Sequence, residues 1–498
     1  MGIYIPEKKR TRLLKYKYSS ADKSLTSKYL LNPFWNWLVT LFPKSVAPNA
    51  ITLLGLSLVF ANFLSLLYYN PTLSCGLKPT HVKHGGTWDP VFVPTWGVTR
   101  TLKFQGWMHW IGLDKVATLV ESAKGQDCAP RWLYWTFAAG LFMYQSLDAI
   151  DGKQARRTGT SGPLGELFDH GCDAINTTLG VLLAASALNL GLDWWTPISL
   201  IATSANFYLT TWEEFHTGTL YLSVFSGPVE GILMIVILFV ITGFTGECRP
   251  QFWDQGILTV TGLERVAFIR DLHLKNIPVN EAFLLFSAVG LLFNIVAAAK
   301  NVYAALPAKS IHSGRKKTPW SLLRPLARLS PFILHTTAMV MWLHAKQAEV
   351  LHTTLLIPFM FLWGISFAHH VQLLILSHLT ASSFPAWWKH PLLVMSLLGA
   401  LDANAYKFQG TELAGFRVQG PLVQTTSDNV KKTILGALVV ALVVYGHFVV
   451  TVINDICDFY QINCLTIKHR KPEDGKSPAE IAQDKKVDPE GSGPESSK

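Results

Sequence analysis

Repeated apolar runs of eighteen or more residues constrain this chain more than any other feature, because each is long enough to cross a bilayer as a helix. Only 15% of the 498 residues are charged, against about 25% in typical soluble domains. We therefore predict an all-α, polytopic membrane protein with about ten transmembrane helices. A soluble enzyme, a disordered scaffold and a small secreted disulfide-rich protein are disfavoured. The predicted spans lie near 48–70, 132–150, 172–191, 194–211, 219–244, 282–300, 329–345, 351–376, 390–406 and 433–456.

The distribution of basic residues predicts the orientation of these spans. The net charge is +10, and residues 1–46 carry nine Lys or Arg against two acidic residues. The segment 300–328 carries seven basic residues and no acid. Both segments adjoin apolar spans, so the positive-inside rule places both in the cytosol, which agrees with an even number of spans. This pattern favours an anionic membrane face over nucleic acid as the partner of the basic charge.

We divide the chain into three parts. Residues 1–46 are predicted to be a cytosolic segment, in which the Trp-containing stretch 29–42 forms either an interfacial amphipathic helix or a buried contact helix. Residues 47–456 are predicted to form a transmembrane domain, with lumenal insertions near 71–131 and 245–281, and residues 457–498 a cytosolic, largely disordered tail. The polar N-terminus shows no cleavable signal, so the first span would act as a signal anchor. A disulfide between Cys75 and Cys128 in the first insertion is a hypothesis.

Four carboxylates between the second and third spans indicate where the chemistry lies. Asp148 and Asp151 are three positions apart, and Asp169 and Asp173 are four apart, so each pair projects from one face of its own helix. Carboxylates at the ends of apolar helices are expensive to bury, and they usually mark a functional site. Two converging pairs would make a site rich in oxygen ligands.

Such a site suits one or two Mg²⁺ or Mn²⁺ ions, because zinc sites usually include sulfur or nitrogen ligands. Two metal ions sharing carboxylates can neutralise phosphate oxygens during displacement at phosphorus. The alternative is that Lys153, Arg156 and Arg157 satisfy the four carboxylates and that no metal is bound.

Small and basic residues surround the first carboxylate pair. Gly152 and Ala155 would allow a nucleotide diphosphate to approach the helix backbone closely. Arg156 could hold a phosphate through two parallel hydrogen bonds. Gly159, Gly162, Pro163 and Gly165 predict the turn between the two helices.

The arrangement of these residues resembles the signature of the CDP-alcohol phosphotransferase family. Eight defined positions over twenty-six residues match in identity and spacing: Asp148, Asp151, Gly152, Ala155, Arg156, Gly165, Asp169 and Asp173. The neighbouring words DGKQARR, PLGELFDHGCD and APNAITLLG resemble the eukaryotic choline and ethanolamine phosphotransferase branch. The resemblance covers residues from about 30 to 460, apart from the two insertions.

This resemblance implies an enzyme that transfers phosphocholine or phosphoethanolamine from the CDP-alcohol to diacylglycerol and releases CMP. It implies a homodimer in the endoplasmic reticulum or Golgi, with the active site facing the cytosol. Asp148, Asp151 and Asp169 would hold one metal ion, and Asp148, Asp169 and Asp173 the other. The CDP moiety would be contacted by Gly152, Ala155, Arg156 and Asn49.

The reaction also requires a base for the proton of the diacylglycerol hydroxyl group. His170 is the best candidate, because an imidazole titrates near neutral pH. Glu166 lies four residues earlier on the same helical face, where it could orient His170 and stabilise its imidazolium form. Asp173 is the rival base, although a metal-bound carboxylate accepts a proton poorly. His170 could instead be an ordinary histidine on the helix surface.

For each of the other polar residues near the spans, a structural role is favoured over a functional one. Glu213, Glu214, His216 and Glu230 could line the headgroup site or be buried with hydrogen-bond partners, and His369, His370 and His378 are more often packing residues than metal ligands. Rival functions are a related transferase with another acceptor such as inositol, a carboxylate-lined transporter and a degenerate scaffold. The transporter lacks support because no internal repeat is evident, and the scaffold because no motif position is lost.

Overall fold

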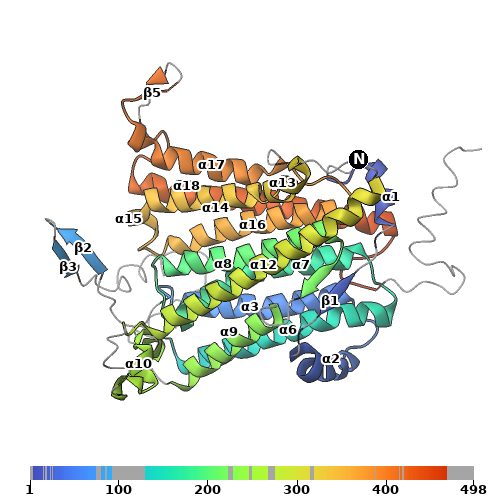
Figure 1. The fold of residues 1–498 in the computed structure, drawn as a ribbon, viewed down its shortest axis with the longest axis horizontal. Coiled ribbons are helices and arrows are strands. Elements are labelled where there is room, and N and C mark those ends of the chain that lie inside the picture. Colours follow the sequence, from blue (N-terminus) through green and yellow to red (C-terminus); the bar gives the residue numbers. More distant parts are fainter. Residues whose placement is uncertain are drawn as a thin grey trace, which may run out of the picture.

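The computed structural model is a bundle of long helices that lie roughly side by side (Figure 1). It describes residues 4–467 apart from several gaps. The gaps are residues 15, 17–18, 23, 25, 74–79, 85–86, 92–128, 223–227, 246–248, 267, 269–274, 314–318, 387–388, 414–415 and 418–419. Cys75, Cys128 and the predicted tail beyond residue 467 lie outside the described residues, so the disulfide hypothesis stays a prediction.

One helix occupies each of the ten predicted ranges. These helices are α3 (Pro48–Tyr69), α6 (Arg131–Thr158), α7 (Pro163–Ala187), α8 (Trp195–Thr217), α9 (Pro228–Phe244), α12 (Val279–Ser313), α14 (Ser330–Ala345), α16 (Leu356–Leu379), α17 (Pro391–Asn404) and α18 (Ser427–Tyr460). Among the described residues, five helical segments are long and apolar enough to cross a membrane: 48–69, 279–306, 323–345, 356–379 and 427–460. The chain is therefore mostly helical with at least these five apolar segments, and the number of ten crossings stays a prediction.

The long helices alternate in direction, so that successive connections lie at opposite ends of the bundle (Figure 1). The N-terminal segment and the end of α18 meet at one end. There Arg10 of α1 (Glu7–Leu13) donates to Asp455 at 2.7 Å, and the Tyr4 hydroxyl lies 3.1 Å from Nδ1 of His447. The first described residues and the later part of α18 therefore lie at the same end of the bundle.

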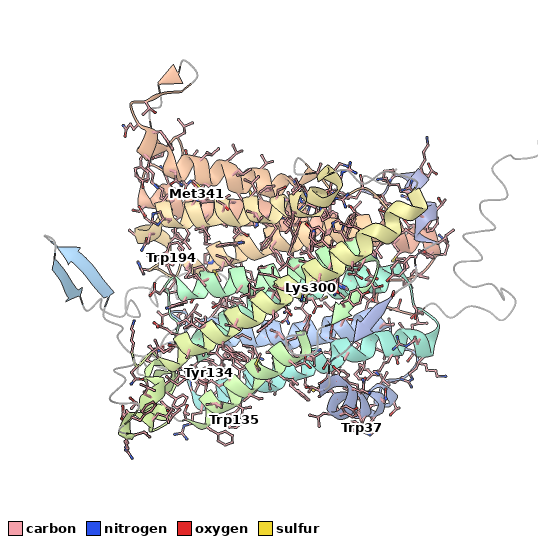
Figure 2. All side chains as sticks on the ribbon, viewed as in Figure 1. Trp37, Tyr134, Trp135, Trp194, Lys300 and Met341 are labelled. Atoms are coloured by element: carbon pink, nitrogen blue, oxygen red, sulfur yellow. The ribbon has the colours of Figure 1, made fainter. Side chains whose placement is uncertain are left out.

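The N-terminal segment contains a run of helical turns against the outside of α6. These are η1 (Ser27–Leu31), α2 (Asn32–Leu38) and η2 (Val39–Leu41). Trp35 is only 5% exposed, whereas Trp37, at the outer edge of the bundle in Figure 2, is 56% exposed. The segment thus contacts the bundle on one face, and its position at a membrane interface stays a prediction.

Short strands accompany the helices. Strand β1 (Ser20–Asp22) pairs in parallel with β4 (Leu220–Leu222), which joins the N-terminal segment to the end of α8. At the opposite end, β2 (Thr80–His84) and β3 (Thr87–Val91) form a hairpin within the first predicted insertion (Figure 1). A second hairpin joins β5 (Glu412–Leu413) to β6 (Phe416–Arg417).

The described residues of the second predicted insertion form short helical turns and an isolated bridge between Gly256 and Pro278 before α12 begins. The turns are η3 (Arg249–Asp254), α10 (Ile257–Val260) and η4 (Leu263–Arg265). Three further short elements connect the later helices: α13 (Pro319–Ala327), α15 (Gln347–Val350) and η6 (Ala405–Phe408). At the end of α9, the helix that contacts η3, Trp135 of α6 packs edge to face on Phe244, with ring centroids 4.4 Å apart (Figure 2).

Burial differs sharply between helices, as expected for a bundle in lipid. Helix α16 is surrounded by α7, α8, α14, α17 and α18, and 89% of its apolar window is buried. In α12 only 6% of the window is buried, and Phe286, Leu292 and Phe293 are exposed. Exposed apolar side chains in this number are unfavourable in water and are tolerated when they face lipid.

Close helix packing at Gly364 of α16 generates a prediction about stability. A Cβ atom at this position would collide with Thr178 of α7, lying 2.8 Å from its Cβ and 2.9 Å from its Cγ2. We expect Gly364→Ala to lower the free energy of unfolding by about 1–3 kcal/mol, because overpacking forces the helices apart. Thermal unfolding of the detergent-solubilised protein measures this change. Gly436→Ala on α18 is the matched control, since no atom lies within 4 Å of its added Cβ. Equal unfolding temperatures for the two variants would contradict the prediction.

Candidate active site

A helix, a tight turn and a second helix position the four aspartates. Helix α6 ends at Gly159, whose φ of +67° is a left-handed conformation that favours glycine. Helix α7 begins at Pro163, a residue whose fixed φ suits the first helical position. The turn predicted from the glycines and proline therefore forms, and it returns the chain so that the two carboxylate pairs face each other.

Three of the four aspartates form one compact group. Carboxylate oxygens of Asp148, Asp169 and Asp173 all lie within 4.8 Å of one another. Oδ1 of Asp148 and Oδ1 of Asp169 are buried and have no hydrogen-bond partner among the described residues. Adjacent buried carboxylates repel one another and lack compensation, so this donor set fits a bound divalent cation.

Neighbouring hydroxyl groups donate hydrogen bonds to Asp151 and Asp173. Thr52 of α3 donates to Oδ2 of Asp151 at 2.6 Å, and Tyr144 of α6 donates to Oδ1 of Asp173 at 2.5 Å. Each bond fixes the rotamer of one carboxylate and leaves its second oxygen available. Such supporting bonds are typical of the residues that orient metal ligands.

The basic residues near the turn do not neutralise the aspartates. Nζ of Lys153 donates to Asn36 at 2.8 Å and to Asn32 at 3.2 Å, in the N-terminal segment. Arg157 donates to the main-chain oxygens of Val39 and Phe42. Among the described residues, these four carboxylates form one ion pair, in which Oδ2 of Asp169 lies 3.8 Å from Nδ1 of His170. Two of the three cations proposed as an alternative to metal therefore serve to anchor the N-terminal segment.

All ten site residues predicted from the sequence line one cavity of about 1670 Å³. They are Asn49, Asp148, Asp151, Gly152, Ala155, Arg156, Glu166, Asp169, His170 and Asp173. Away from the carboxylates the same cavity is lined by apolar side chains of α7, α8, α9 and α12, among them Val181, Ile198, Ile235 and Leu284. One end of the cavity is thus anionic and the other end suits hydrocarbon.

The segment after α18 closes part of the cavity. Nδ2 of Asn49 donates to the main-chain oxygen of Cys464 at 3.1 Å, and Val46 forms an isolated bridge with Thr466. Burial raises the pKa of the Cys464 thiol, so this side chain stays neutral beside the carboxylates. Helix α18 runs to Tyr460 instead of ending near 456, and residues 461–464 line the cavity although they were assigned to the tail.

The candidate base His170 is buried and oriented by its own helix. Its Nδ1 lies 3.0 Å from the main-chain oxygen of Glu166, which accepts a hydrogen bond from the protonated nitrogen. The Glu166 carboxylate instead groups with Glu214 of α8 and His378 of α16, with donor atoms within 4.8 Å of one another. Orientation of His170 by the Glu166 side chain stays a prediction, while the main-chain contact is observed.

Two of the remaining polar candidates, Glu213 and His370, have contacts of a structural kind. Glu213 is buried and accepts a hydrogen bond from Asn301 at 2.6 Å, as its structural interpretation expects. His370 packs against His335 and His390, with ring centroids 4.7 and 4.5 Å away. These contacts are packing contacts between α14, α16 and the start of α17.

Sequence analysis missed the residues that support the site from other elements. Tyr144 lies four positions before Asp148 and hence on the same helical face, which was an available signal. Thr52 lies within the APNAITLLG word but carries no signal of its own. The contribution of Cys464 depends on the return of the chain after α18, which no local pattern indicates.

The helical bundle and the buried carboxylate group define an integral membrane protein with a site suited to a divalent cation. Residues 117–264 match the family model described as CDP-alcohol phosphatidyltransferase. A Schizosaccharomyces pombe protein described as an uncharacterized CDP-alcohol phosphatidyltransferase class-I family protein is 36% identical over 477 residues, which are 95% of this chain and 100% of that protein.

Two named relatives from Saccharomyces cerevisiae also match over most of the chain. Cholinephosphotransferase 1 is 33% identical over 478 residues, covering 95% of this chain and 100% of the relative. Choline/ethanolaminephosphotransferase 1 is 33% identical over 398 residues, covering 79% of this chain and 83% of the relative. The chain therefore belongs to the CDP-alcohol phosphatidyltransferase family, as the motif predicted.

The bond from Thr52 to Asp151 generates a prediction about metal binding. We expect Thr52→Val, which keeps the side-chain shape, to weaken Mn²⁺ binding about tenfold to a hundredfold, because a freed carboxylate loses its orientation. Calorimetric titration of the purified protein with Mn²⁺ measures the affinity. Ser57→Ala on the same helix is the control, since its exposed hydroxyl donates to the main-chain oxygen of Leu53. Unchanged Mn²⁺ affinity in the Thr52 variant would contradict the proposed orientation of a metal-binding Asp151 by Thr52.

Proposed function

We propose that this protein transfers phosphocholine or phosphoethanolamine from the CDP-alcohol to diacylglycerol, producing phosphatidylcholine or phosphatidylethanolamine and CMP. The observation that carries the proposal is a single cavity with a carboxylate group at one end and an apolar lining at the other. A polar nucleotide donor and a lipid acceptor need these two surroundings in contact. The named relatives, cholinephosphotransferase and choline/ethanolaminephosphotransferase, support the same activity.

The cofactor that we assign to the aspartates is Mg²⁺ or Mn²⁺, bound as two ions. Asp148, Asp151 and Asp169 would hold one ion, and Asp148, Asp169 and Asp173 the other. The bound ions would neutralise the diphosphate of the donor and the charge that develops on departing CMP. The unpaired oxygens of Asp148 and Asp169 support this assignment.

The residues around the aspartates would bind the nucleotide. Gly152 exposes the α6 backbone, because an added Cβ there would meet only Nη1 of Arg156, at 3.7 Å. Arg156 lines the cavity and is suited to hold a phosphate oxygen of the CDP group. Ala155 and Asn49 line the same wall, where a small side chain and an amide would accommodate the cytidine nucleotide.

His170 would take the proton of the diacylglycerol hydroxyl as that oxygen attacks the β-phosphorus of the CDP-alcohol. The bond from Nδ1 to the Glu166 main-chain oxygen leaves Nε2 as the proton acceptor. The neighbouring Asp169 carboxylate would stabilise the imidazolium that results. Proton transfer from oxygen to nitrogen and loss of CMP complete the transfer.

The cellular setting follows from the same proposal. Diacylglycerol reaches the cavity from the bilayer, and the basic segments favour a cytosolic active site in the endoplasmic reticulum or Golgi membrane. We also propose a homodimer. Transfer to another acceptor such as inositol is the nearest alternative activity.

CMP release tests the proposed reaction directly. We expect the purified protein in lipid nanodiscs to release CMP only with Mg²⁺, diacylglycerol and CDP-choline or CDP-ethanolamine. Asp169→Asn should abolish turnover, because it removes a carboxylate that both metal ions would share. Folded protein without turnover on either donor would overturn the proposal, and CDP-diacylglycerol with inositol would then be tested. Asp193→Asn, at an aspartate that does not line the cavity, is the control.

The base assignment has its own test. We expect His170→Gln to lower kcat about a hundredfold to ten-thousandfold while the KM for the CDP-alcohol changes little, since general-base catalysis acts at the chemical step. His344→Gln, at a histidine outside the cavity lining, serves as the control. A kcat within a few-fold of the wild-type value would exclude His170 and favour Asp173.

A further inference from the structure

We propose that Glu166, Glu214 and His378 form a second metal site, selective for a transition ion such as Zn²⁺ and separate from the aspartate group. The three residues come from α7, α8 and α16, and one donor atom from each lies within 4.8 Å of the other two. A metal there would join three helices at the end of the bundle that carries the aspartates. This site goes beyond the transfer reaction, and it uses the Glu166 carboxylate in place of the predicted role of that side chain in orienting His170, whose observed contact is with the Glu166 main chain.

The Glu166 side chain is the observation that points to a ligand. The residue is only 8% exposed, and both of its carboxylate oxygens are buried without a hydrogen-bond partner among the described residues. A buried polar group without a partner costs free energy, and the cost is larger for a carboxylate than for a neutral group. No hydrogen bond from the described residues compensates the burial of this carboxylate, and a bound cation would do so.

A second buried carboxylate increases that need. Glu214 is 3% exposed and faces Glu166 across the α7–α8 contact. Two carboxylates at this separation repel each other in a medium of low dielectric constant. A divalent cation between them converts the repulsion into attraction.

The donor set distinguishes this site from the aspartate site. Two carboxylates and one imidazole resemble the oxygen and nitrogen ligands that Zn²⁺ accepts with three protein groups and a water molecule. The aspartate group offers only oxygen and suits Mg²⁺ or Mn²⁺. In a large excess of Mg²⁺, the imidazole of His378 should therefore retain Zn²⁺ at the second site.

An ion has a route to this site. Glu166 lines the cavity that also contains the aspartates, whereas Glu214 and His378 are not among the lining residues. The cavity thus supplies an entry path, and the ion would not need to separate the packed helices. An alternative occupant is the ammonium group of a phosphoethanolamine donor, which the experiment below also tests.

Zinc content is the first measurement. We expect the purified full-length protein, dialysed with Zn²⁺ in a large excess of Mg²⁺, to retain one Zn²⁺ per chain by inductively coupled plasma mass spectrometry. Glu214→Gln and His378→Gln should each lower the retained Zn²⁺ at least about tenfold, as loss of one of three ligands does. Asp169→Asn should retain the ion.

The matched control is Glu213→Gln, because Glu213 is the neighbour of Glu214 on α8, is equally buried and bonds Asn301 instead. We expect it to retain Zn²⁺. Thermal unfolding provides a second readout: Zn²⁺ should raise the unfolding temperature of the wild-type protein and of Glu213→Gln, but not of Glu214→Gln. Wild-type protein that folds and unfolds cooperatively yet retains no Zn²⁺ overturns the proposal.

Two further results would also overturn it. Loss of Zn²⁺ in Asp169→Asn, with full retention in Glu214→Gln, would place the ion at the aspartates. Displacement of Zn²⁺ by ethanolamine, with no effect of choline, would assign the two glutamates to a headgroup. Failure of CMP release alone would leave the zinc measurement unaffected, so the two proposals fail separately.

Discussion

The burial of several carboxylates side by side in a helical membrane domain is the constraint on which this structure depends. Asp148, Asp169 and Asp173 approach within 4.8 Å, where mutual repulsion opposes folding unless cations enter. The left-handed Gly159 and the helix start at Pro163 impose the approach by turning the chain sharply between α6 and α7. The apolar packing of the surrounding helices must supply enough favourable free energy to keep the carboxylates together.

The supporting contacts show how the rest of the bundle adapts to this constraint. Thr52 of α3 and Tyr144 of α6 each hold one aspartate oxygen, while Lys153 is directed to the N-terminal segment. The Lys153 ammonium group is thereby kept off the carboxylate oxygens that face the cavity. The arrangement preserves negative potential where cations and a diphosphate would meet, and the relatives named for choline and ethanolamine phosphotransfer are consistent with that chemistry.

Local patterns were sufficient to predict the helices and the core of the site, because helical periodicity and turn residues act over a few positions. The pairs Asp148–Asp151 and Asp169–Asp173 could be placed on helix faces from spacing alone. The support from Thr52 and the return of Cys464 could not be predicted, since both depend on which helices become neighbours. For the same reason the group of Glu166, Glu214 and His378 emerges only from the packing of three helices.

The pairing of the first residues with the last helix has a consequence for biosynthesis. Tyr4 and Arg10 contact His447 and Asp455, so the first turns of the N-terminal segment gain these two contacts only after α18 has left the ribosome. The cavity also stays incompletely enclosed until then, because the bond from Asn49 to the main-chain oxygen of Cys464 joins positions more than four hundred residues apart. Synthesis of α18 and of the residues that follow it is therefore also the step that closes this wall of the catalytic chamber.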